Sequence, residues 1–132
     1  MAISKSSVVE SKLIKGSYNM QKFDEFIIND IMPNMPNDTI LMDGATIHKS
    51  KAFAEILKNN NKKKIFNIPY SPQYNPIEFV FNTMKADIKK NNVTSLNQLK
   101  RILLKNFKKG NINGYENYYD HTYNNILRDL KK

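Results

Sequence analysis

Two acidic residues of this chain occupy positions that suit metal-assisted chemistry on phosphates. Asp43 directly follows the apolar run Thr39–Met42, and Glu78 lies just inside a predicted helix start. The two positions differ by 35, so 34 residues separate the carboxylates. Mg²⁺ takes oxygen ligands and is usually held by one or two carboxylates together with substrate phosphates. An acid leaving a strand and an acid entering a helix therefore predict a divalent-metal site for phosphoryl transfer.

Each acid also has a purely structural interpretation. Asp43 precedes Gly44, and Asp-Gly is a strong turn signal. Glu78 stands at the third helical position after a predicted N-cap, Asn75, with Pro76 between them, which is the pattern of a capping box. A carboxylate that caps a helix uses the same oxygens that would bind a metal. The residue pattern alone leaves both interpretations open.

The sequence segments around the two acids resemble those of the catalytic domain of mariner-type and insertion-sequence DDE transposases. That family carries the signature Pro-Tyr-Ser-Pro-x-x-Asn-Pro-Ile-Glu, which residues 69–78 match at every specified position. Its other signature, Asp-Asn-Ala-x-x-His, is matched at Asp43, Ala45 and His48, whereas Gly44 stands where asparagine is usual. The spacing of 34 residues also fits, and the resemblance covers nearly the whole chain.

The resemblance implies a fold, a cofactor and a reaction. The fold would be an α/β ribonuclease H-like mixed sheet with flanking helices and the strand order 3-2-1-4-5. Asp43 and Glu78 would be catalytic residues and would hold Mg²⁺ or Mn²⁺. The intact family enzyme would hydrolyse a DNA strand at a transposon end and join the 3′ hydroxyl to target DNA.

The same resemblance implies that one catalytic aspartate and its strand are missing. That aspartate belongs on the first, central strand, and this chain is expected to begin near the second. Asp24, Asp30 and Asp38 do not lie at the required position. We therefore expect an N-terminally truncated DDE catalytic domain that is inactive alone. The alternative is a non-catalytic basic module that binds DNA or pairs with a full-length transposase, and a homodimer is a further expected partnership.

Three further residues are weaker site candidates. His48 matches a family histidine and would lie beside the site, although a polar residue at a helix start is often simply solvated. Lys85 follows Glu78 by seven residues and so shares its helix side. Lys85 and Lys89 are candidates for DNA phosphate contacts, with exposed lysines as the alternative.

The elements that must position these residues alternate between strand and helix. Residues 1–14 are predicted to form a β-hairpin. Apolar residues at helical spacing predict a helix from Met20, with Asn19 as N-cap, and Thr39–Met42 is expected to be a strand covered on both faces. Further elements are predicted as helices at about 50–58, from 76 and at about 95–107, a strand at 64–68 and a helical tail. This order predicts an α/β fold in one domain, residues 1–132, with a core of about 1–92 and a helical extension of about 93–132.

Composition restricts the partners. The chain has 132 residues and a formal charge of +9, which favours a polyanion such as DNA, although abundant lysine can also reflect base composition. It has no cysteine, which excludes disulfides and thiolate metal sites. No apolar run of 18 residues is present, so we expect no membrane partner and an intracellular protein that acts with the DNA.

Overall fold

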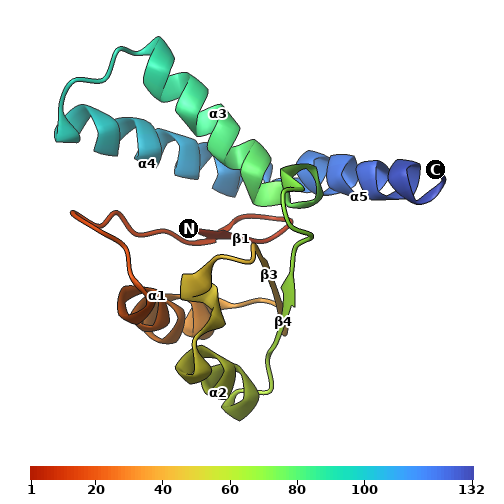
Figure 1. Cartoon of the computed structure of the whole chain (residues 1–132). Helices are drawn as coiled ribbons and strands as arrows, with labels where there is room; N and C mark the ends of the chain where they lie inside the picture. The colour runs from red at the N-terminus through yellow and green to blue at the C-terminus, as the bar shows by residue number, and fades with distance from the viewer. The chain divides into compact units, whose positions relative to one another are not determined.

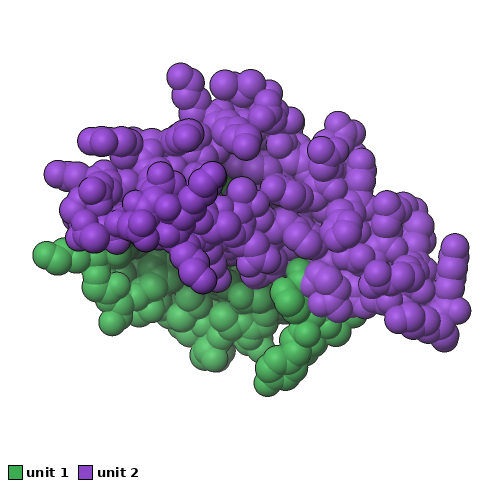
Figure 2. Space-filling model, turned by 90° about the horizontal axis from the view of Figure 1, so that it is seen from above, with its two compact units in different colours: residues 1–2, 9–72 green, residues 3–8, 73–132 purple.

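The computed structural model describes residues 1–132 as two compact units. The first unit contains residues 1–2 and 9–72, and the second contains residues 3–8 and 73–132 (Figure 2). Short strands and five α-helices confirm the predicted α/β composition. The predicted single domain with a helical extension from residue 93 stays a prediction.

The N-terminal segment forms the expected hairpin. Strands β1 (Ala2–Ile3) and β2 (Val8–Glu10) pair in a two-stranded sheet. The Ser4 amide donates to the Ser7 carbonyl at 2.8 Å and closes the turn between the strands.

The first unit is built around a cluster of apolar side chains. Helix α1 (Met20–Phe26) begins at Asn19, whose side chain accepts from the Lys22 amide at 2.9 Å, as predicted. The chain continues as a π-helical turn, η1 (Ile27–Ile31), and a 3-10 turn, η2 (Met32–Asn34). Helix α2 (Lys51–Asn59) starts at Ser50. The buried cluster consists of Phe23, Phe26, Ile27, Ile31, Met42, Phe53 and Leu57.

A second two-stranded sheet carries the strand that leads to Asp43. Strand β3 (Thr39–Met42) pairs in parallel with β4 (Lys63–Phe66), and α2 provides the crossover between them (Figure 1). Parallel strands need such a crossover, because the first strand ends at the opposite end of the sheet from where the second strand begins. The two sheets share no strand pairing, so β3 pairs with β4 alone.

One face of this sheet departs from the prediction. Leu41 and Ile65 lie opposite each other in the register and are 42% and 57% exposed. The expectation that Thr39–Met42 is covered on both faces was therefore wrong. Met42 packs into the apolar cluster from one face, whereas Leu41 on the other face stays partly open to solvent.

The second unit is helical. Helix α3 (Pro76–Lys90) contacts both α4 (Leu96–Asn113) and α5 (Glu116–Leu130). Helix α4 extends six residues beyond its predicted end at residue 107, through Gly110, and stops at Gly114. Gly114 has φ +67°, a conformation that favours glycine, whereas Gly110 is helical and packs against Tyr115. None of the helices combines the length and apolar character needed to span a lipid bilayer.

Candidate functional site

Asp43 lies at the carboxyl end of β3, where open α/β sheets usually place ligands. Its side chain is 59% exposed. Atom Oδ1 accepts the Ala45 amide and lies 2.9 Å from His48 Nδ1. Atom Oδ2 has no hydrogen-bond partner within its unit. The turn and the metal-ligand interpretations are therefore compatible, because the turn uses only one carboxylate oxygen.

His48 holds the Asp43 side chain from the next element, the 3-10 turn η3 (Thr46–Lys49). Its Nδ1 lies 2.9 Å from Asp43 Oδ1 and 3.2 Å from the Asp43 carbonyl oxygen. Both neighbours are acceptors, so Nδ1 must carry the ring proton and donate it. The ring also packs on Phe23, with a centroid distance of 4.5 Å. The imidazole thus orients the carboxylate while leaving one of its oxygens free.

Gly44 is the one departure from the family signature in this turn. Its φ is not left-handed, and a Cβ built on it would meet only the Lys49 side chain, at 3.7 Å or more. The backbone therefore has no need of glycine here. A residue with a Cβ, such as the asparagine usual in the family, would need no change of the backbone at this position.

Glu78 lies in the first turn of α3, and the capping box predicted around it is absent. Asn75 is the N-cap residue, but its side chain makes no capping hydrogen bond. The first turn closes through the Glu78 amide, which donates to the Asn75 carbonyl at 3.1 Å. The Glu78 carboxylate has no hydrogen-bond or ion-pair partner within its unit. Its oxygens are therefore not used by the helix cap and are free to bind another group.

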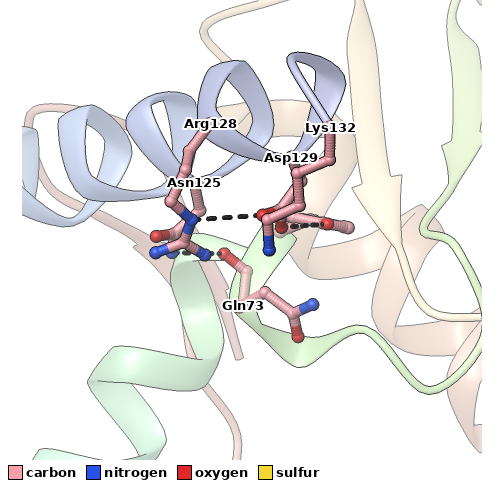
Figure 3. Close-up of polar contacts among 6 residues, drawn as sticks. Gln73, Asn125, Arg128, Asp129 and Lys132 are labelled. Carbon is pink, nitrogen blue, oxygen red and sulfur yellow. Dashed lines mark hydrogen bonds and ion pairs between the residues drawn. The ribbon is translucent and has the colours of Figure 1, made fainter.

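The segment leading into α3 is held by the last helix of the chain (Figure 3). This segment includes the 3-10 turn η4 (Pro72–Tyr74). The Tyr74 hydroxyl donates to Asp129 Oδ2 at 2.5 Å, and the Asn125 amide donates to the Gln73 carbonyl at 3.2 Å. These two bonds connect α5 to the residues that immediately precede the Glu78 turn.

Asp129 is the most perturbed carboxylate of the chain. Its pKa is lowered from 3.8 to about 2, first by the Tyr74 hydrogen bond and then by the hydrogen bond from Arg128. The Arg128 Nε lies 3.1 Å from Asp129 Oδ1, and Lys132 Nζ lies 3.5 Å from the same atom. The ionised carboxylate is thus an anchor for the η4 turn rather than a free acid.

Lys85 and Lys89 are both exposed on α3 and make no ion pair. Their exposure agrees with the predicted DNA contact and equally with solvated lysines, so the assignment stays a prediction.

The structure brings together only some of the predicted residues. Asp43 and His48 contact each other in the first unit, whereas Glu78, Lys85 and Lys89 belong to the second. No group of three or more histidine or acidic side chains converges on a possible metal position. A site shared by Asp43 and Glu78 therefore stays a prediction.

Sequence reasoning missed Asn125 and Asp129, which position the η4 turn. The sequence provides only a weak indication of this role, because a spacing of four residues shows merely that the two side chains share one side of α5. Their partners lie 52 and 55 residues earlier in the chain.

Comparison with known proteins provides one match. Residues 1–100 match the family model described as DDE superfamily endonuclease. No curated protein and no solved structure matches the chain.

Proposed function

The chain belongs to the DDE superfamily endonucleases, and we propose that it serves a transposase of the mariner or insertion-sequence type. A transposase-type endonuclease acts on DNA, so DNA is its substrate. The proposed reaction is metal-dependent cleavage of one strand followed by transfer of its 3′ hydroxyl to a second DNA. The residue-for-residue match of 69–78 supports this subtype.

We assign the metal-binding role to Asp43 and Glu78. The observation that carries this assignment is the availability of their oxygens. The Asp43 carboxylate contacts Ala45 and His48 through Oδ1 alone, so its Oδ2 lacks a partner in its unit. Both carboxylate oxygens of Glu78 also lack a partner in their unit, and the cap of α3 does not use them. Carboxylate oxygens suit Mg²⁺ or Mn²⁺. Such ions, when bound, activate an attacking oxygen and stabilise a leaving one.

The surrounding residues would prepare these carboxylates. His48 keeps the Asp43 side chain in one orientation through its Nδ1 proton. The carboxylate would therefore lose less conformational entropy when it binds a metal ion. Tyr74 and Gln73, tied to α5, fix the start of the helix that carries Glu78. Lys85 and Lys89 would contact the phosphates of the bound strand.

We further propose that the fold is a ribonuclease H-like sheet that lacks its central strand. The support is the parallel β3–β4 pair with its crossover helix and the free edge of β3, along which that strand would lie. The missing strand would bring the third carboxylate. Because none of Asp24, Asp30 and Asp38 matches the position of the first family aspartate, we expect these 132 residues alone not to cut DNA.

Manganese titration followed by NMR tests the shared site. Paramagnetic Mn²⁺ should broaden the amide signals around Asp43 and Glu78 over the same concentration range. Asp43→Asn and Glu78→Gln should each abolish the broadening at both places, whereas the exposed Asp38→Asn should leave it unchanged. Broadening at one acid alone, or broadening that persists in both variants, would contradict a shared site.

A second candidate function is that of a non-catalytic module that binds DNA. Such a module would form a homodimer or pair with a full-length transposase inside the cell. The net charge of +9, with its exposed lysines, favours it. Plasmid nicking in Mg²⁺ or Mn²⁺ distinguishes the two functions. Nicking that disappears in Asp43→Ala would support the enzyme and overturn the expected inactivity, whereas salt-dependent binding without nicking would support the module.

A further inference from the structure

We propose that the exposed face of α4 is a contact surface for the DNA backbone, separate from the two carboxylates. The proposal rests on the proposed function in taking DNA as the partner. Helix α4 has 18 residues, with five basic side chains and no acidic one. All five are exposed: Lys100, Arg101, Lys105, Lys108 and Lys109. We call these five residues the α4 basic face.

The packing of α4 keeps this face turned outward. Partly buried residues occupy the opposite side of the helix, namely Leu99, Ile102, Leu103, Asn106 and Phe107, together with the buried Gly110. Asn106 donates to Asp87 Oδ2 of α3 at 3.1 Å. A rotation that buried the basic side chains would break these contacts. The cations are therefore held on one side of a rigid helix.

The α4 basic face has no neutralising partner in its unit. The acids of α5 are occupied elsewhere: Glu116 and Asp120 lie 3.5 and 3.8 Å from Lys5, and Asp129 is held by Tyr74. Residues 76–113 contain eight basic and two acidic side chains and carry a net charge of +6 of the chain's +9. Most of the chain's excess positive charge thus lies on the α3–α4 hairpin. No acidic side chain of the unit forms an ion pair with the basic residues of α4.

The spacing of the cations suits a polyphosphate. With a rise of about 1.5 Å per residue, Lys100 and Lys109 are separated by roughly 13–14 Å along the helix. Duplex DNA carries about one negative charge per 1.7 Å of its axis, so several phosphates lie within that length. Lysine and arginine that neutralise these phosphates release counterions, which gives binding without sequence preference.

A lipid surface fits α4 less well. An interfacial helix needs one continuous apolar face to insert. The exposed apolar residues of α4, Leu96, Leu104 and Ile112, are eight residues apart, so each is turned by about 80° from the previous one. They form no stripe, and the continuous apolar side of α4 is used against its own unit. A helix with exposed basic residues but no exposed apolar stripe is better suited to nucleic acid than to a lipid surface.

Four of the five basic residues lie beyond residue 100, where the family match ends. The α4 basic face therefore belongs largely to the part of the chain that the superfamily pattern does not describe.

Fluorescence anisotropy with a labelled duplex at several salt concentrations tests the proposal. The test variant replaces Arg101, Lys105, Lys108 and Lys109 with glutamine, which has a similar helix propensity. We expect weaker binding and a slope of log affinity against log salt that is smaller by roughly 2–4, from about 0.9 per lost phosphate contact. Far-UV circular dichroism confirms that the variant is folded.

A matched control removes the same charge from the first unit, through glutamine at Lys15, Lys51, Lys58 and Lys63, all of them exposed. The control should retain most of the slope. Equal losses in both variants would show that only net charge matters and would overturn the proposal, as would an unchanged slope in the test variant. Binding to vesicles of phosphatidylcholine and phosphatidylserine that exceeds binding to DNA, and that the test variant loses, would assign the face to membranes and also overturn it.

The carboxylates are tested separately. The α4 test variant should retain the Mn²⁺ broadening around Asp43 and Glu78. If Mn²⁺ does not broaden the signals around Asp43 and Glu78 in the unaltered protein but the α4 test variant has a smaller salt slope, the metal site alone is refuted. If the broadening is present but the α4 test variant has an unchanged slope, the α4 basic face alone is refuted.

Discussion

Replacing Gly110 with alanine should destabilise the protein, against the usual behaviour of a glycine within a helix. Alanine is ordinarily better than glycine in a helix interior by about 1 kcal/mol. At Gly110, however, the new Cβ would collide with the hydroxyl and ring of Tyr115. Tyr115 is only 7% exposed, and its amide donates to the Lys5 carbonyl at 2.9 Å, so the ring cannot move away freely. Overpacking of this kind costs roughly 1–3 kcal/mol, and the better helix propensity of alanine offsets about 1 kcal/mol of it. We therefore expect a net loss of up to about 2 kcal/mol in the free energy of unfolding.

Equilibrium unfolding in urea, followed by circular dichroism at helical wavelengths, measures this loss. Gly44→Ala is the control, because its Cβ would meet only the end of the Lys49 side chain, and we expect a change within about 0.5 kcal/mol. In a Tyr115→Leu background the collision disappears, and Gly110→Ala should become neutral or stabilising. A Gly110→Ala protein that is more stable by about 1 kcal/mol in the original background would refute the packing of Tyr115 on α4.

Three other changes test the packing and electrostatics. Tyr74→Phe removes the largest cause of the low pKa of Asp129, so this pKa should rise from about 2 toward its ordinary value in a carboxyl NMR titration, and an unchanged pKa would contradict the contact. Because folding lowers this pKa, the stabilisation from Asp129 is present above about pH 4 and is lost as the pH falls toward 2, and Tyr74→Phe should flatten that loss in acid unfolding curves. Ser50→Ala removes the cap that accepts the Phe53 amide and should cost about 1 kcal/mol in urea unfolding. Phe53→Ala empties a fully buried position and should cost about 3–5 kcal/mol, whereas Leu41→Ala, at a 42% exposed position, should cost far less.

Local patterns in the sequence predicted the elements well. The N-cap at Asn19 and the run Thr39–Met42 are determined by neighbouring residues, and both are confirmed. The prediction of a capping box at Asn75 was only partly correct. A sequence pattern shows which groups can form a hydrogen bond but not which of them do so in the folded chain. The end of α4 was placed too early for a related reason: a glycine can stop a helix or let a side chain pack against it, and only Tyr115 decides between these at Gly110.

The candidate site depended on the motifs rather than on local propensity. Asp43, His48 and Glu78 were found because whole signatures surround them, and the Asp43–His48 contact is a short-range one of five residues. The contacts that fix the start of α3 span more than 50 residues. No spacing rule within one helix reveals a partner so distant, so the roles of Asn125 and Asp129 could be recognised only from the folded chain.

The hold of α5 on the η4 turn also bears on how such proteins can change over generations. A protein ending at residue 100 would keep every residue of the 69–78 motif, yet Tyr74 and the Gln73 carbonyl would lose the groups that bind them. Recombination that joined a relative's motif region to an unrelated tail would meet the same difficulty, unless the new tail supplied an acceptor for the tyrosine. The portion that can be exchanged as one block therefore extends to about residue 130, and the two ends of that block are expected to evolve together.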